Sequence, residues 1–323
     1  MDFILSEDQE MVRDAARRLM GGACPIALVR AVAGGDRAAG DPLWRHLSDW
    51  LPLGNGSLVE LCLFLEETGA ALAPGPLLAS SALYAPLTGD AEQTGTVALA
   101  GPDGQWVPND SPVKSFVIEA DGVSRVAVVL GGPRVAVVEA SDLASRQVAT
   151  LDSTRRVFEV TVPDAVVAGA APVDPAVVAR VLERAWVALS AELLGVTRWL
   201  FDTALAYAKV RVQFERPIGS FQAIQHKLAD MALVRERAWA AVYYAAMAVE
   251  AGDADGRRAA HVAKAAAGVA ARRCAKEAIQ IHGGIGFTWE HDLHLYMRRA
   301  FFSERLLGTT DWHHDRIADL ILA

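Results

Sequence analysis

The longest helical pattern in the chain constrains its fold most. It runs from Pro175 to Arg211 and contains no proline after its first residue. Apolar residues recur along it at the spacing of one helix face over about ten turns. Only Gly195, a weak helix former, interrupts the pattern. A helix of this length is typical of a helical bundle.

Four further helical patterns follow this one along the chain. They cover 221–250, 256–282, 292–307 and 310–321. Short turns connect them, so neighbouring helices should run antiparallel. We therefore predict a C-terminal four-helix bundle over residues 171–323.

The first part of the chain, residues 1–92, also reads as helical. Ser6 followed by Gln9 is a capping-box pattern that opens a helix through Met20. Asp41-Pro42 places proline at the first helical position of a second helix. Residues 57–69 form an amphipathic pattern that Gly69 should close. A further helix is expected from the prolines at 74–76 to about Leu87.

Residues 93–170 differ in composition from both flanks. They contain short runs rich in β-branched residues, separated by Gly, Pro, Asp and Asn, at 96–100, 115–119, 123–130, 134–139 and 157–162. Such runs indicate a small, mainly antiparallel β-domain. The predicted fold is therefore mainly α with a small β-domain, divided into 1–92, 93–170 and 171–323.

Composition excludes several classes of protein. Hydrophobic residues make up 52% and charged residues 22%, as in soluble globular chains, and the net charge of −8 disfavours sequence-independent nucleic-acid binding. The scattered cysteines, Cys24, Cys62 and Cys274, support neither a disulfide framework nor a thiolate zinc site. The N-terminal residues lack a secretory signal, and no apolar stretch approaches the ~20 residues of a membrane span. We expect a cytoplasmic protein.

Two motifs with defined spacing carry the functional prediction. The first runs from Arg211 to Gln222 and reads RVQFERPIGSFQ, and the second runs from Gln280 to Phe287 and reads QIHGGIGF. They resemble the patterns R-x-x-F-G-x-x-I-x-x-x-Q and Q-x-x-G-G-x-G-[YF] of the acyl-CoA dehydrogenase family, at about the separation seen there. Glu215 stands where that family has glycine. Weaker matches extend the resemblance over nearly the whole chain.

The resemblance implies an FAD-dependent enzyme that desaturates an acyl-CoA thioester. In the family both motifs contact the FAD of a neighbouring subunit, which implies an obligate oligomer. The physical chemistry agrees, because a guanidinium pairs bidentately with a pyrophosphate and a glycine pair lets backbone approach a ligand closely. The residues that the resemblance assigns to FAD are Arg211, Phe214, Gln222, Gln280, Gly283, Gly284 and Thr309.

The catalytic base departs from the family pattern. Such enzymes remove the α-proton of the substrate with a carboxylate within hydrogen-bond reach. In much of the family a glutamate precedes the Gly-Thr at the last helix junction, but here that residue is Leu307. The alternative family position, on the first bundle helix, falls at Ala185. The remaining candidates for a relocated base are Glu192, Glu183 and Glu304.

The middle domain also departs from the family. The T-E-P-x-x-G-S-D and W-I-T-N segments that cup the flavin ring are absent from 96–115, and Trp106 is not followed by a hydroxyl residue. Short chains of this kind resemble actinobacterial steroid- and cholesterol-degrading subunits of α2β2 heterotetramers. We therefore expect a full-length acyl-CoA dehydrogenase partner that supplies the base. The alternatives are a catalytically complete homo-oligomer and a flavin-free scaffold subunit.

The late histidines predict no metal centre. A di-iron bundle requires Glu-x-x-His pairs on two helices, whereas Glu290 and His294 are four apart and have no second pair.

Overall fold

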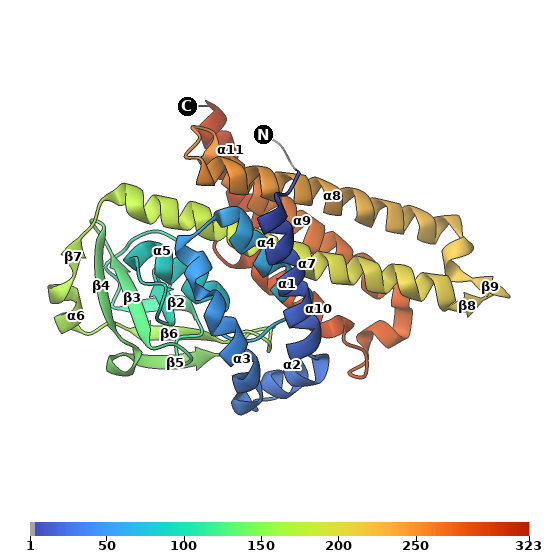
Figure 1. Cartoon of the computed structure of the whole chain (residues 1–323), viewed down its shortest axis with the longest axis horizontal. Coiled ribbons are helices and arrows are strands. Elements are labelled where there is room, and N and C mark those ends of the chain that lie inside the picture. The colour runs from blue at the N-terminus through green and yellow to red at the C-terminus, as the bar shows by residue number, and fades with distance from the viewer. Residues whose placement is uncertain (1–3, 323) are drawn as a thin grey trace.

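The computed structural model describes residues 4–322, and in it a small β-region lies at one end of a mainly helical molecule (Figure 1). The N-terminal residues 1–3, part of the segment predicted to lack a secretory signal, lie outside the described residues. In the described part of the chain, no helix combines the length and apolarity needed to cross a membrane.

The N-terminal part is helical, as predicted. Ser6 caps α1 with the expected capping box: its hydroxyl accepts from the Gln9 N–H while the Gln9 side chain accepts from the Ser6 N–H. The α-helices of this part are α1 (Glu7–Ala23), α2 (Ile26–Ala33), α3 (Asp41–Leu47), α4 (Leu58–Ala70) and α5 (Ala85–Thr88). The segment predicted as a helix from the 74–76 prolines forms a π-helical turn at Ala79–Tyr84 before α5.

Gly69 does not end α4, contrary to the prediction. The helix continues through it to Ala70 because Gly69 lies against the backbone of the long helix α7 (Pro175–Val210). A Cβ on Gly69 would stand 2.1 Å from the Glu192 carbonyl oxygen, and one on Gly195 would stand 1.9 Å from that of Glu66. The two glycines therefore allow α4 and α7 to cross in backbone contact.

The β-region contains two sheets. The first has the strand order β1 (Gly95–Ala98), β3 (Arg125–Leu130), β4 (Arg134–Glu139), β7 (Ala171–Pro172), and the second the order β2 (Val113–Ile118), β6 (Val157–Thr161), β5 (Ala144–Val148). Within residues 4–322, only β1 and β3 pair in parallel, so the expected mainly antiparallel character holds. A separate apolar core contains Val117, Val128 and Phe158.

Strand β5 and helix α6 of the β-region were not predicted. Strand β5 is an edge strand whose residues are mostly exposed and polar, so it has no apolar alternation to reveal it. The short helix α6 (Asp164–Gly169) has no buried residue. Both lack the burial pattern on which prediction from sequence depends.

The C-terminal helices form a bundle around α7. They are α8 (Gln222–Glu250), α9 (Gly256–His282), α10 (Leu293–Arg305) and α11 (Thr310–Leu322). A hairpin of β8 (Val212–Gln213) and β9 (Arg216–Pro217) joins α7 to α8 and projects from one end of the bundle (Figure 1). The observed helix boundaries lie within a few residues of those predicted, while the three domain boundaries remain a prediction.

Candidate functional site

The first motif forms the projecting end of the bundle. Arg211 is exposed, directly after the last residue of α7, and its carbonyl accepts from the Ile218 N–H at 2.8 Å. Phe214 lies at the hairpin tip with 86% of its surface exposed. Phe214 and Glu215 have φ values of 52° and 65°, the left-handed region that favours glycine, which accounts for glycine in the family pattern.

Gln222 is exposed and opens α8, and no side chain caps that helix start. An uncapped helix start presents backbone N–H groups and the positive end of the helix dipole. Arg211 and the start of α8 therefore belong to one short connection that favours an anion.

The second motif ends α9. Gln280 is exposed in its last turn, and Gly283 ends the helix with φ 63°. A Cβ added to Gly283 or Gly284 would meet no atom within 4 Å. The backbone of both glycines is thus open to an approaching ligand.

The structure brings the two motifs together within one chain. Tyr207, one turn before Arg211, stacks on His282, the residue before Gly283, with 4.3 Å between ring centroids. The buried His282 donates its Nδ1–H to the Ala278 carbonyl oxygen at 2.8 Å, and burial lowers the pKa of this side chain. The end of α7 and the end of α9 consequently form one surface.

Apolar and cationic side chains surround this surface. Phe287 is 73% and Trp289 66% exposed, with Arg298 over the Trp289 ring at 4.7 Å. Arg216 lies over Phe221 at 4.1 Å. A phosphate-bearing aromatic ligand fits such a surface, because arginines attract its charge and flat rings accept its base. The residues present thus fit the dinucleotide end of FAD.

The position that the family uses for its base is apolar here. Leu307 is buried, with φ 60°, and precedes Gly308, with φ 107°. It lines a cavity of about 10 Å³ that Ala185, the alternative base position, also lines. That volume holds at most about one water. Neither the leucine nor the alanine side chain can remove a proton.

Glu192 is held in a buried ion cluster. Its Oε2 accepts from Arg155 Nη2 at 2.5 Å and its Oε1 from Arg299 Nη1 at 3.3 Å. Arg299 Nε also donates to Asp152 at 2.6 Å. Since both carboxylate oxygens of Glu192 bind guanidinium groups, this side chain ties α7 to its neighbours.

The other two glutamates also have structural surroundings. Glu304 is buried, and its carboxylate accepts from the Thr310 N–H at 3.0 Å at the start of α11. Glu183 is half-buried, and burial raises its pKa, while Arg257 and Arg180 act in the opposite direction. Neither glutamate lines the Leu307 cavity or the larger cleft beside it.

That larger cleft, of about 540 Å³, lies where the β-region meets α10. Thr309 and Arg305 lie on its bundle side, and Thr150 on its β side. The rest of its wall is mainly apolar and includes Trp106, Phe116, Leu151, Phe301, Phe302 and Leu306. Thr309, the seventh predicted FAD residue, therefore lies in this cleft and apart from the six at the bundle end.

The buried ion cluster was not predicted from sequence. Arg299 is fully buried on α10, on the same helix face as Leu295, Tyr296 and Ser303. An arginine on an apolar helix face requires a buried counter-ion, and that is the signal from which it could have been found.

Among residues 4–322, no group of three or more His, Cys, Asp or Glu side chains is placed to hold a metal ion. His294 instead packs edge-on against Trp289, and His291 against His282.

Comparisons with known proteins bear on the predicted family. The model of the acyl-CoA dehydrogenase C-terminal domain matches residues 176–322. Acyl-CoA dehydrogenase IpdE2 of Mycobacterium tuberculosis is 32% identical over 318 residues, which cover 93% of this chain and 93% of IpdE2. Acyl-CoA dehydrogenase FadE34 of the same organism is 36% identical over 331 residues, which cover 94% of this chain. The chain spans only 46% of FadE34.

A solved structure, a variant of the Tcur3481-Tcur3483 steroid ACAD, shares the fold with a TM-score of 0.87. It is 27% identical and covers 98% of each chain. The predicted fold class is confirmed. The 32% identity with IpdE2 over 93% of each chain, together with the C-terminal domain match, shows that this chain belongs to the acyl-CoA dehydrogenase family.

Proposed function

We propose that this chain is a subunit of an FAD-dependent acyl-CoA dehydrogenase, that it completes the flavin site of a partner chain, and that it carries no catalytic base. One contrast supports the proposal. The bundle end with Arg211 and Gly283 is open and cationic, whereas the base position at Leu307 is closed and apolar.

The bundle end would hold the dinucleotide part of the flavin. Arg211 would pair with the pyrophosphate, assisted by the uncapped start of α8. Gly283 and Gly284 would admit the ligand to the backbone, and Gln280 can donate to it and accept from it. Phe214 offers an exposed flat surface at the same corner.

The reaction itself needs a base and a hydride acceptor. A bound FAD would supply the acceptor for the β-hydride of the acyl-CoA. Removal of the α-proton needs a carboxylate in contact with the substrate, and Leu307 and Ala185 leave that task to the partner. This chain's contribution is then to bind and orient.

Similarity to two known proteins supports a steroid-like substrate and a heteromeric subunit composition. The Tcur3481-Tcur3483 structure is described as a steroid ACAD of two named components, which favours a bulky, steroid-like acyl-CoA and a heteromeric α2β2 assembly. FadE34 is more than twice as long as the part that this chain matches, so one polypeptide has room for a second such unit.

The two rivals have less support. A complete homo-oligomer needs a base, and Glu192, Glu183 and Glu304 lie outside the cleft. A flavin-free scaffold has no use for an exposed arginine beside an open glycine pair.

The test is to purify the chain alone and together with a full-length acyl-CoA dehydrogenase chain that co-purifies with it. We expect stoichiometric FAD and turnover only in the complex. Arg211→Ala should weaken FAD binding by about ten- to a hundredfold, the cost of a lost charge-assisted pair. Arg45→Ala, which removes an exposed arginine on α3, is the matched control and should bind FAD normally.

Two results would overturn the proposal. One is a lone chain that binds FAD stoichiometrically and oxidises an acyl-CoA. The other is an active complex in which Arg211→Ala leaves FAD affinity unchanged.

A further inference from the structure

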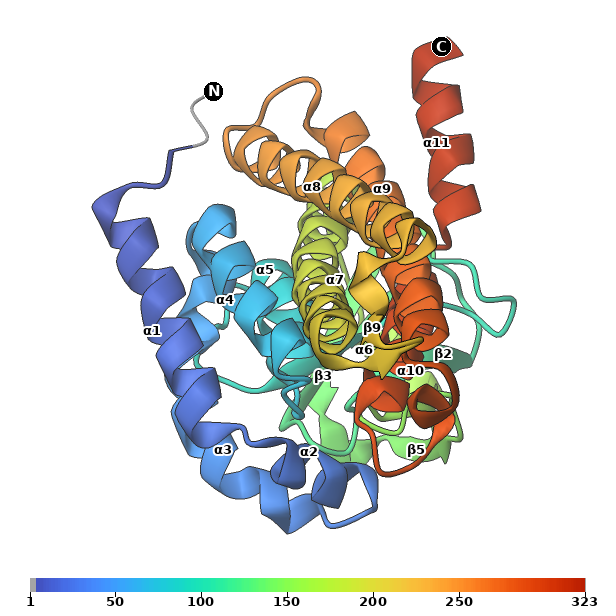
Figure 2. The same cartoon turned by 90° about the vertical axis from the view of Figure 1, so that its right-hand side faces the viewer.

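The cleft between the β-region and α10 has aromatic rings on both of its sides. Trp106 and Phe116 line it from the β side, with 6.1 Å between their ring centroids. Phe301 and Phe302 of α10 line it from the bundle side. In Figure 2, strand β2, which carries Phe116, lies beside α10. Rings on two sides of a cavity of about 540 Å³ suit a flat, apolar molecule larger than a single ring.

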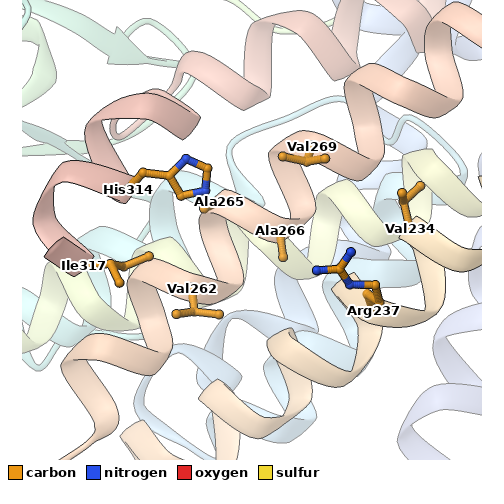
Figure 3. Close-up of a pocket in the computed structure, with 8 residues that line it drawn as sticks. All are labelled: Val234, Arg237, Val262, Ala265, Ala266, Val269, His314 and Ile317. Carbon is orange, nitrogen blue, oxygen red and sulfur yellow. The ribbon is translucent and has the colours of Figure 1, made fainter. Parts of the chain in front are cut away.

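The groove between α8, α9 and α11 has no comparable walls. Its volume is about 210 Å³, and valine, isoleucine and alanine side chains line it together with Arg237 and His314 (Figure 3). Aliphatic side chains present no flat faces on which a ring system can stack. The aromatic cleft is therefore the better candidate for a small-molecule site.

Phe116 has a strained backbone. Its φ is 57°, in the left-handed region that a bulky side chain rarely adopts. It lies where the pairing of β2 with β6 shifts register, between Lys114 and Val117. Because the residue is 43% exposed, packing in the core does not account for this conformation. Strain of about 1–3 kcal/mol is typical of ligand-binding segments, and here it belongs to a ring that lines the cleft.

The wall of the cleft also carries an unpaired cation. Arg305 is exposed, and it forms no ion pair with any carboxylate among residues 4–322. The two hydroxyl groups on the wall already make hydrogen bonds within the chain. Thr150 donates to the Asp152 carbonyl at 3.0 Å, and Thr309 accepts from the Trp312 N–H at 3.2 Å. The guanidinium is thus the strongest polar group that a ligand meets here, and it favours a carboxylate.

We propose that this cleft binds a rigid, fused-ring molecule with one carboxylate, its rings between the aromatic walls and its carboxylate on Arg305. A rigid ring system loses less conformational entropy on binding than a flexible chain of the same size. A flavin ring fits poorly, because its nitrogen and carbonyl groups would lose water at a mainly apolar wall. The bound molecule would bridge the β-region and α10 and so stabilise the folded chain.

The proposal does not depend on the proposed flavin role. The β-region and the β8–β9 hairpin lie toward opposite ends of α7 (Figure 1). Binding in the cleft can therefore be measured on the FAD-free chain, while Arg211→Ala in the complex bears only on the flavin surface.

The experiment is a fluorescence titration of the purified full-length chain with 1-pyrenecarboxylate, a flat fused-ring carboxylate. We expect saturable binding of one molecule per chain. Deoxycholate below its micellar concentration, a second fused-ring carboxylate, should displace the probe. Decanoate, a flexible carboxylate, and FAD should displace it at least about tenfold less effectively, because the first loses more entropy on binding and the second is more polar.

Two variants separate the contributions of ring and charge. Phe116→Gly removes one ring and suits φ 57°, so the chain should unfold at the same urea concentration or a higher one, yet bind the probe at least about tenfold more weakly. Phe214→Gly is the matched control, because Phe214 is also exposed and has φ 52°, and it should leave probe affinity unchanged.

Arg305→Met should weaken 1-pyrenecarboxylate by about ten- to a hundredfold and leave the affinity for uncharged 1-pyrenemethanol unchanged. Arg45→Met, on α3, is its control and should have no effect on either.

Three results would overturn the proposal. The first is a folded wild-type chain without saturable binding, and the second is wild-type affinity in Phe116→Gly or Arg305→Met. The third is displacement by FAD as effective as that by deoxycholate, which would make the cleft a flavin site.

Discussion

At the scale of the residue, Leu307 shows what a single side chain decides. Its backbone is left-handed and it precedes a glycine with φ 107°, and these two residues turn the chain from α10 into α11. The side chain is buried among Leu83, Val97 and Ala185. A carboxylate here would be desolvated and would have no partner. Such burial raises the pKa of a carboxylate, which suits a catalytic base but destabilises the folded core.

Leu307→Glu should therefore destabilise the chain by about 3 kcal/mol or more, since it places an ionisable group in an apolar cavity of about 10 Å³. Urea unfolding monitored by circular dichroism measures the change. Leu307→Met, which conserves volume and polarity, should cost less than about 1.5 kcal/mol. Equal stabilities of the two variants would mean that this site is solvated.

At the scale of the element, side chains of α9 bind the connection from α10 to α11 and hold it in place. The buried Lys264 donates to the carbonyls of Glu304 at 2.8 Å and Gly308 at 3.1 Å, and so replaces the usual capping of the last turn of α10. His313 Nε2 lies 3.2 Å from the Leu307 carbonyl and therefore carries the hydrogen. Its Nδ1 then accepts from His261 Nδ1 at 2.8 Å. Burial lowers the pKa of both histidines, consistent with two neutral rings.

This arrangement gives stability a pH dependence. Burial lowers the pKa of Lys264 to about 7, although nearby Glu304 opposes the shift. An unfolded lysine has a pKa of about 10.4, so between these values the unfolded state binds more protons and the free energy of unfolding rises with pH.

Lys264→Met should remove that rise, whereas Lys276→Met, which changes an exposed lysine on the same helix, should retain it. Urea unfolding at pH 7 and pH 9 makes the comparison. Parallel pH profiles for wild type and Lys264→Met would contradict a lowered lysine pKa.

At the scale of the whole molecule, one buried ion cluster joins the β-region to the bundle. Asp152 and Arg155 come from the segment before β6, Glu192 from α7 and Arg299 from α10. Burial opposes the charge on Arg299, but the Asp152 and Glu192 carboxylates outweigh it and raise its pKa. The charges of two carboxylates and two guanidinium groups cancel, so the buried cluster is stable only when all four side chains are present.

Arg299→Met should cost about 3–5 kcal/mol of unfolding free energy, because it leaves two buried carboxylates short of a counter-ion. Arg298→Met removes a neighbouring, half-buried arginine that lies over Trp289, and should cost about 1 kcal/mol or less. Calorimetry of both variants tests the difference. A small change in unfolding free energy for Arg299→Met would mean that apolar packing alone joins the β-region to the bundle.

Much of the helical architecture could be predicted because its signals are local. Capping at Ser6, the prolines at helix starts and the apolar periodicity of residues 256–282 each depend on residues within a few turns of one another. The motifs at 211–222 and 280–287 were likewise readable as sequences. Gly69 was wrongly predicted to end its helix. Glycine is needed there because the backbone of α7, which is distant in the sequence, packs against it.

The amino-acid sequence by itself determined the long helices, most of the runs of strand residues and the absence of a carboxylate at position 307. Only the tertiary structure decided that Tyr207 stacks on His282 and so unites the two motifs, that Glu192 is held by two arginines, and that α11 leaves a groove uncovered. Periodicity reports which face of an element is buried. It does not report which distant element covers that face, because that choice depends on packing among residues far apart in the chain.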